Sequence, residues 1–117
     1  ELQDASGMAA STFVKTADLN QLLVEMRNHP HFDVYKMSLP VAGQDGSLEN
    51  RFTNSPLNGK LYGKTGYVSG VRSISGYMEG DSGKPLVFSV VTNNFIEKTS
   101  YVDAIQEQIL EKIYVKY

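Results

Sequence analysis

Gly59-Lys-Leu-Tyr-Gly-Lys-Thr-Gly-Tyr67 is the stretch that decides the fold of this 117-residue chain. Side chains alternate along a strand, so the consecutive Lys64 and Thr65 are expected on opposite faces of a sheet. Gly63 and Gly66 leave the backbone bare, so that a ligand or another chain can approach closely. A run of this composition predicts either a loop that cradles phosphate or a strand that walls a substrate cleft.

Three consecutive strands are expected, over residues 60–66, 71–79 and 85–93. Gly70 and the loop Gly80-Asp-Ser-Gly83 supply short connections, which predict an antiparallel meander. The third strand alternates between two apolar faces, formed by Leu86, Phe88 and Val90 on one side and by Val87 and Val91 on the other. A strand that is apolar on both faces belongs in a sheet covered on both sides.

Helices are expected before and after these strands, which gives an α+β fold. The first spans about 17–28, with Thr16 as its N-cap and an end before Pro30. Its core-facing residues fall at helical spacing and are Leu19, Leu22, Leu23 and Met26. A short second helix is expected over 31–38, and a last one over about 98–114. The packing face of the last helix is predicted to consist of Val102, Ile105, Ile109 and Ile113, widened by Ala104, Leu110 and Tyr114.

Composition narrows the classes of protein. Hydrophobic residues make up 41% and charged residues 21%, which is typical of a globular domain. The net charge of −2 and the absence of a basic cluster argue against nucleic acid as a partner. There is no cysteine, so disulfides and thiolate metal sites are excluded, and His29 and His31 alone do not predict a metal site. We expect no cofactor.

Two kinds of site compete for the Lys64-Thr65 pair. A phosphate loop needs four residues between its glycines and a helix after the threonine, whereas Gly59 and Gly63 enclose three residues and the sequence continues as a strand. The alternative is the Lys-Thr-Gly element of serine acyl-transfer enzymes that act on D-alanyl peptides and β-lactams. An ammonium and a hydroxyl on a cleft wall can bind a carboxylate, and the Tyr67 N–H can face a developing oxyanion. The tripeptide alone also fits a solvated surface strand.

Further segments, in order along the chain, surround this tripeptide. They are Asp4-Ala-Ser-Gly-Met8, Leu39-Pro-Val-Ala-Gly43, Asp45-Gly-Ser-Leu48, Arg51-Phe52, Ser75-Gly-Tyr77 and Asn93-Asn-Phe95. Together with Gly63-Lys-Thr-Gly66 they resemble the D-alanyl-D-alanine carboxypeptidase/endopeptidase family of low-molecular-mass class C penicillin-binding proteins. The resemblance implies a penicillin-binding transpeptidase/β-lactamase-like fold, with an antiparallel five-stranded sheet flanked by helices. It also implies acyl-enzyme chemistry on peptidoglycan D-Ala-D-Ala peptides, binding of β-lactams, and an extracytoplasmic location in the periplasm or cell envelope.

The same resemblance suggests roles for single residues. Lys64, Thr65 and the backbone N–H of Tyr67 would be catalytic, the last as an oxyanion-hole donor. Gly66, Tyr62 and Arg51 would contact substrate, although Arg51 could instead form an ion pair on its loop, where Asp45 shapes the turn.

Two elements of that family are missing from the sequence. No serine has lysine three positions on or asparagine two positions on, so neither Ser-x-x-Lys nor Ser-x-Asn is present. We therefore expect residues 1–117 to be the C-terminal portion of one penicillin-binding domain, with the nucleophile upstream of Glu1, and the isolated chain to be inactive. The exposed edge of strand 85–93 would then pair with the upstream segment or with a second copy. The alternative is a non-catalytic module of the same fold that binds peptidoglycan or protein.

Overall fold

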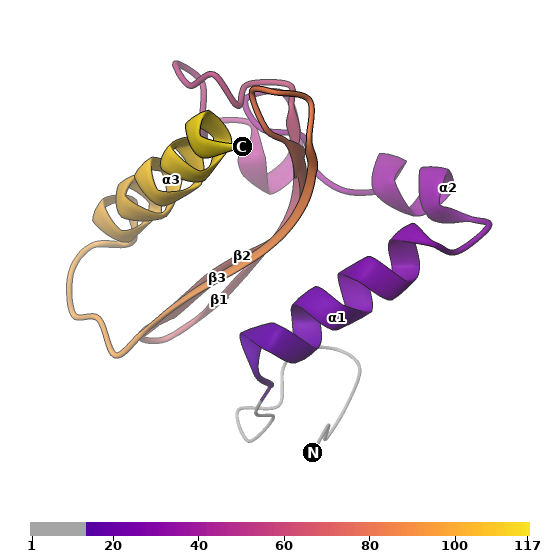
Figure 1. The fold of residues 1–117 in the computed structure, drawn as a ribbon. Coiled ribbons are helices and arrows are strands. Elements are labelled where there is room, and N and C mark those ends of the chain that lie inside the picture. Colours follow the sequence, from indigo (N-terminus) through magenta and orange to yellow (C-terminus); the bar gives the residue numbers. More distant parts are fainter. Residues whose placement is uncertain (1–13) are drawn as a thin grey trace.

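An antiparallel sheet in the order β1-β2-β3 forms the centre of the structure, a computed structural model that describes residues 14–117 (Figure 1). Its elements in chain order are α1 (Thr16–Arg27), α2 (Phe32–Met37), the 3-10 helix η1 (Gly46–Leu48), β1 (Leu61–Val68), β2 (Val71–Glu79), β3 (Pro85–Asn93) and α3 (Thr99–Lys116). The predicted meander is confirmed, and β1 runs two residues beyond its expected end. The Asp4–Met8 segment of the family resemblance lies outside the described residues.

Helices cover both faces of the sheet, with α3 on one side and α1 and α2 on the other (Figure 1). Strand β3 contributes side chains to both layers. Phe88 belongs to the cluster that contains Leu110 of α3, and Val87 packs against the cluster that contains Leu23 of α1. The larger cluster, on the α3 side, consists of Ala42, Leu48, Phe52, Leu57, Leu61, Ile74, Met78, Phe88, Leu110 and Tyr114. The prediction of a sheet covered on both sides is therefore confirmed.

The start and the core face of α1 differ from the sequence-based expectation. Lys15, not Thr16, occupies the N-cap position, and it makes no side-chain capping bond. Leu23 is the buried residue of α1, whereas Leu22 is 64% exposed. Leu19 and Met26 of the predicted face are half-buried, so α1 contacts the sheet along a narrow stripe that leaves Leu22 exposed.

The packing face of α3 is rotated relative to the predicted one. Its buried residues are Val102, Gln106, Leu110 and Tyr114, whereas Ile105 and Ile109 are 39% and 41% exposed. Gln106 is fully buried because its amide donates hydrogen bonds to the Arg72 carbonyl and the Thr92 hydroxyl, each at 3.1 Å. A pattern that counts only apolar residues misses such a position. Of the predicted face, Val102, Leu110 and Tyr114 are buried as expected, whereas Ala104, Ile105 and Ile109 are exposed.

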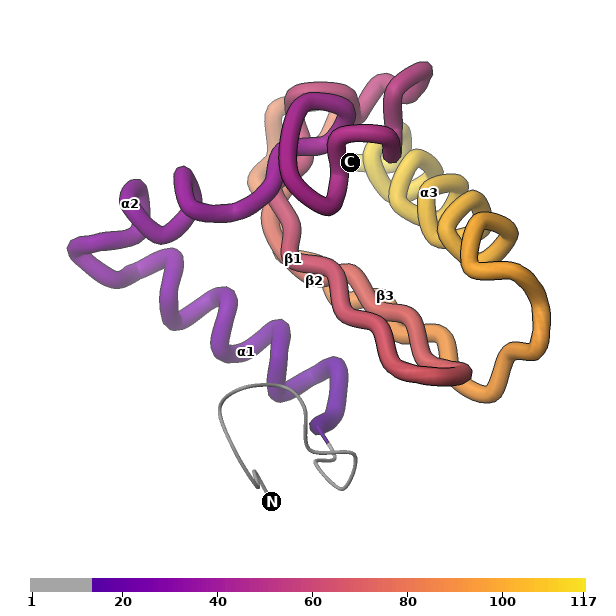
Figure 2. Tube along the Cα trace, turned by 180° about the vertical axis from the view of Figure 1, so that it is seen from behind, coloured from indigo at the N-terminus to yellow at the C-terminus, as the bar shows by residue number. Residues whose placement is uncertain are grey.

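The segment between α2 and β1 lies at one end of the sheet (Figure 2). It is ordered by the larger core cluster, to which it contributes the fully buried Leu48 and Leu57 and also Phe52, which is 2% exposed. An isolated bridge joins Val41 to Tyr62, so the segment also lies beside β1. None of the helices in residues 14–117 has the length and apolar character needed to cross a membrane.

Candidate active site

The outer edge of β1 is covered over its first half and open over its second. Gly63 N–H donates to the Pro40 carbonyl at 3.0 Å, and the Leu61 carbonyl accepts from Ala42 N–H at 2.9 Å. Backbone groups alternate in direction along a strand, so the N–H and C=O of Thr65 and Tyr67 also point away from β2. Within residues 14–117 no backbone hydrogen bond beyond the sheet ladders reaches either of these two residues.

Lys64 brings its charge to this open edge. Its side chain is exposed, and Nζ donates a hydrogen bond to the Thr65 carbonyl at 2.7 Å. That carbonyl is one of the outward-facing groups, so the ammonium and the Tyr67 N–H lie along the same stretch of edge. An anionic group placed there would meet a cation and a backbone donor together.

Thr65 is anchored to the loop before β1. Its hydroxyl donates to the hydroxyl of Ser47 at 2.8 Å, and Ser47 belongs to the one-turn helix η1. This contact orients the threonine at the start of the open edge. Sequence reasoning missed Ser47, because eighteen residues separate the two hydroxyls and no local spacing connects them.

Gly66 occupies a position without room for a side chain. A Cβ at this residue would lie 2.5 Å from the Ser73 hydroxyl oxygen, which is closer than such atoms approach. Glycine is therefore the residue that fits beside the Ser73 hydroxyl at this position of β1.

The Tyr67 side chain is 59% exposed, and the guanidinium of Arg72 lies 5.9 Å from its ring centre.

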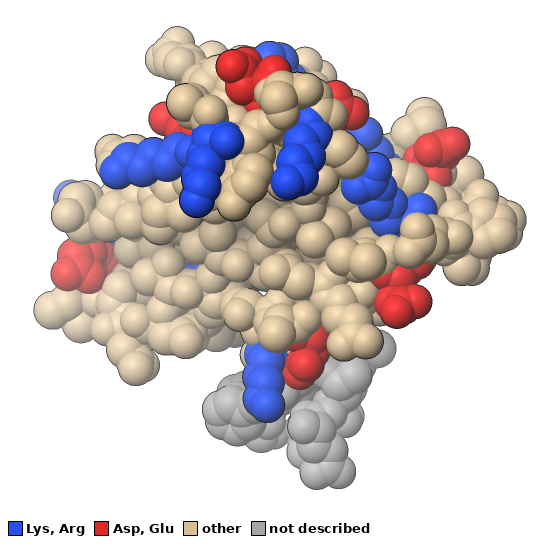
Figure 3. Space-filling view, viewed as in Figure 1, with Lys and Arg blue, Asp and Glu red and all other residues tan. Residues whose placement is uncertain are grey.

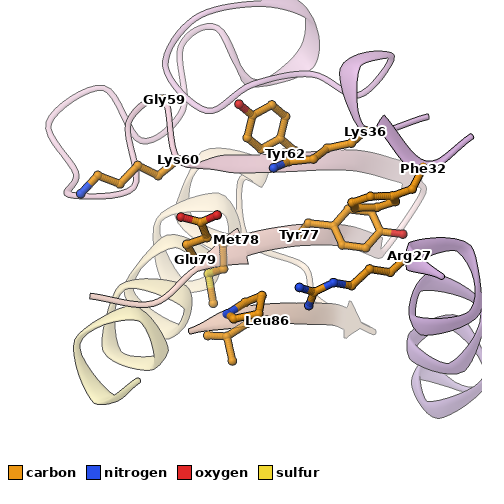
Figure 4. A pocket seen from close by; sticks show the side chains of 11 residues that line it. Arg27, Phe32, Lys36, Gly59, Lys60, Tyr62, Tyr77, Met78, Glu79 and Leu86 are labelled. Carbon is orange, nitrogen blue, oxygen red and sulfur yellow. The ribbon is translucent and has the colours of Figure 1, made fainter. Parts of the chain in front are cut away.

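Tyr62 lies on the α1 and α2 side of the sheet, beside a pocket of about 300 Å³ (Figure 4). Lys36 Nζ sits 4.4 Å from the centre of its ring. Tyr62 and Lys64 share this face of β1, because they are two residues apart on one strand. The structure thus places Tyr62 near the predicted site, although its hydroxyl is not part of the open edge.

Arg51 lies on the other side, against α3. It is 7% exposed, with Nε 2.9 Å from Glu107 Oε1 and Nη1 3.2 Å from Asp103 Oδ1. The ion pair that the sequence suggested is confirmed, and this geometry favours a structural role over substrate contact. Asp45 shapes its turn as expected, because its carboxylate accepts a hydrogen bond from Val41 N–H.

Charged side chains on the face seen in Figure 3 are mixed, with acidic groups interspersed among the basic ones. Within residues 14–117 no three His, Cys, Asp or Glu side chains gather in a way that could hold a metal ion. The geometry therefore centres on Lys64, Thr65, Gly66 and Tyr67 at the open edge.

Comparison with known proteins identifies the family. The profile of the D-Ala-D-Ala carboxypeptidase 3 (S13) family matches residues 1–112. The chain belongs to this family. The D-alanyl-D-alanine carboxypeptidase of Actinomadura sp. (strain R39) is 36% identical over 97 residues, which cover 79% of this chain and 18% of that protein. The penicillin-sensitive carboxypeptidase A of Dictyostelium discoideum is 29% identical over 116 residues, covering 92% of this chain and 22% of the relative.

Carboxypeptidase DacB of Mycolicibacterium smegmatis is 28% identical over 100 residues, which cover 80% of this chain and 22% of that protein. The chain spans about a fifth of the length of these relatives. Penicillin binding protein 4 (dacB) from Haemophilus influenzae superimposes with a TM-score of 0.88 at 20% identity, over 97% of this chain and 27% of that one. Its complex with a β-lactam gives 0.80. The expected fold and family resemblance are both confirmed.

Proposed function

We propose that this S13-family chain forms one wall of the cleft of a serine-type D-Ala-D-Ala carboxypeptidase. The observation that carries the proposal is the open half-edge of β1, which aligns the Lys64 ammonium, the Thr65 hydroxyl and the Tyr67 N–H. Lys64 and Thr65 would bind the terminal carboxylate of a peptidoglycan stem peptide. The substrate backbone would lie along Gly66, and the Tyr67 N–H would be one oxyanion-hole donor.

The nucleophile would come from outside this chain. A serine nucleophile needs a base within hydrogen-bonding reach. Across the described part of the chain, no serine hydroxyl is hydrogen-bonded to a lysine or histidine nitrogen; the Thr65 hydroxyl is bonded to Ser47. We therefore propose that acylation, whether by D-alanyl peptides or by β-lactams, requires an upstream segment that carries the serine and its base.

The unpaired outer edge of β3 is the position where we expect the upstream segment to join the sheet. In the sheet order β1-β2-β3, the edge of β3 that faces away from β2 has no partner strand among the described residues. An exposed edge of backbone donors and acceptors favours pairing with another strand. Either the upstream segment or a second copy of the chain would complete the sheet there. An extracytoplasmic location follows if peptidoglycan is the substrate.

Covalent labelling by a fluorescent penicillin tests the proposal. The chain expressed together with its upstream coding sequence is expected to be labelled and to release D-alanine from an acyl-D-Ala-D-Ala peptide, whereas the isolated chain is not. Lys64→Met should lower the second-order rate constant of acylation by about tenfold to a hundredfold, because a hydrogen bond to a charged group contributes about 1.5–3 kcal/mol. Lys84→Met, at an exposed lysine of the β2–β3 loop, is the matched control and should leave the rate unchanged.

Two results would contradict the proposal. Labelling of the isolated chain would show that the nucleophile lies within it. Failure of the longer protein to be labelled or to release D-alanine, together with retained binding of stem peptide, would favour the non-catalytic binding module.

A further inference from the structure

Tyr67 lies at the open end of β1, where its N–H and C=O face away from β2. The planar peptide group that carries this N–H is shared with Gly66, whose carbonyl faces Ser73 of β2, and the side chain of Tyr67 adds a further contact with that strand. Its partner in the register is Arg72, at a position where the two strands exchange no hydrogen bonds. Side chains of such a pair are immediate neighbours, at about 4.5–5.5 Å between their Cβ atoms. The contact of the tyrosine ring with the arginine therefore adds to the strand pairing in fixing this end of β1.

Arg72 presents a guanidinium that is held in a single orientation. Its Nε donates to Asp103 Oδ1 at 2.7 Å and its Nη2 donates to Asp103 Oδ2 at 2.9 Å. Both side chains are 18% exposed. A two-bond contact between these planar groups fixes their relative orientation, which a lysine cannot do. The guanidinium carbon lies 5.9 Å from the Tyr67 ring centre, within the range of a cation–π contact.

Asp103 is fixed in turn by a second arginine. Arg51 Nη1 lies 3.2 Å from Asp103 Oδ1, and Arg51 Nη2 donates to the Asp103 carbonyl at 3.2 Å. Glu107, one turn further along α3, accepts from Arg51 Nε at 2.9 Å. Two cations and two carboxylates thus balance one another between the loop, β2 and α3. The backbone of Arg72 is tied to the same helix, because its carbonyl accepts from the buried Gln106 amide.

We propose that Arg72, clamped by Asp103, is a positioning residue for the Tyr67 N–H. The inference rests on the proposed function of that N–H as an oxyanion donor. Such a donor acts when it is preorganised at about 2.7–3.1 Å from the developing charge. A displacement of about 1 Å at a reacting group can slow a reaction by about a hundredfold. Arg72 itself touches no substrate atom in this arrangement, so it affects the acylation step and not the binding of the carboxylate.

Saturation kinetics of acylation by a β-lactam test this role in the protein that contains the chain and its upstream segment. Such kinetics separate the dissociation constant of the non-covalent complex from the first-order acylation rate. Arg72→Met should lower the rate about tenfold or more and change the dissociation constant less than about twofold. Arg72→Lys should give nearly the same loss, because it keeps the charge and loses the two-bond contact. Glu111→Gln, on α3 outside the cluster, is the matched control with an unchanged rate.

A second readout follows the backbone directly. Amide relaxation measured by NMR should give Tyr67 an order parameter of about 0.85 in the parent protein and a lower one in Arg72→Met. Tyr62, on the paired half of β1, should stay rigid in both. A parent protein that is not acylated would overturn the proposed function and this inference with it. A parent protein that is acylated, with Arg72→Met acylated equally fast or with Tyr67 equally rigid, would overturn the positioning role alone.

Discussion

Tyr77 joins the sheet to the α1 and α2 layer, and its ionisation should set the alkaline limit of stability. The side chain is 5% exposed, and its hydroxyl donates to the Leu23 carbonyl of α1 at 2.9 Å. Phe32 and Tyr35 of the α2 region pack edge-on against its ring, with centres 5.0 and 6.3 Å away. Ionisation of this phenol would place a charge inside that layer and remove the donor to α1.

The pKa of Tyr77 is raised to about 12, mainly by burial and in part by nearby Tyr35, while Arg27 acts to lower it. In the unfolded chain a tyrosine ionises near pKa 10. The folded state therefore keeps its proton between about pH 10 and 12 while the unfolded state loses it, so the free energy of unfolding falls as the pH rises through this window. A difference of two pKa units corresponds to about 3 kcal/mol.

The difference in the free energy of unfolding between the parent and Tyr77→Phe should change sign as the pH rises. At about pH 7 the variant is expected to be less stable by about 1 kcal/mol, because the hydrogen bond to Leu23 is lost. Between about pH 10 and 12 the parent loses its Tyr77 contribution and the variant does not, so the two free energies of unfolding should converge and then cross. Urea unfolding followed by circular dichroism measures both curves.

The matched control is Tyr101→Phe, because Tyr101 is 60% exposed on α3. Its stability should follow the parent across the whole pH range, because removal of an exposed hydroxyl leaves the layer around Tyr77 unchanged. The reasoning would be refuted if the Tyr77→Phe curve ran parallel to the parent curve, or if the Tyr77 phenol titrated near pH 10 in the folded chain.

Three further outcomes are expected in the same urea unfolding assay. Gly66→Ala should destabilise the chain by about 1–3 kcal/mol, and adding Ser73→Ala should restore most of the loss, because the atom 2.5 Å from the new Cβ is then gone; a double variant no better than the single one would contradict the clash. Leu110→Ala should cost about 2–5 kcal/mol and Ile109→Ala less than about 1, with equal costs arguing against the observed phase of α3. A hydrogen bond to a tyrosine hydroxyl of α3 raises the pKa of Lys60, so Lys60→Met should lose stability below the ordinary lysine pKa and approach the parent above it, and a constant difference would count against this bond.

The strands were predictable from the sequence because their pattern is local. Alternation along residues 85–93 placed Phe88 and Val87 on opposite faces, and each face has its own helical layer. The helices lie at nearly the expected bounds, but the buried face of α3 differs from the predicted one. Gln106 belongs to its buried face for a reason that lies 34 residues away, at the Arg72 carbonyl. A helical period drawn from apolar residues alone cannot include a position whose burial depends on a distant acceptor.

The site divides in the same way. The strand that carries Lys64, Thr65 and Gly66 was predictable because its pattern is local, and the roles of these residues stay predictions. Ser47 and the Arg72–Asp103 pair were not predictable, because their contacts join segments 18 and 31 residues apart. Arg51 was ambiguous between an ion pair and a substrate contact for the same reason: its partners on α3 become apparent when the helix is placed in space.

Pro40 explains why the open half of β1 starts at the Lys-Thr-Gly element. The segment before β1 pairs with it as a short extra strand, through Val41 opposite Tyr62 and through the bond from Gly63 N–H to the Pro40 carbonyl. Proline has no N–H, so it cannot return a bond to the Gly63 carbonyl, and the pairing cannot continue past it. The next residue of β1 is Lys64. A proline that ends the covering strand thus leaves the following residues of β1 as an uncovered edge, which is the backbone surface that an extended peptide substrate needs.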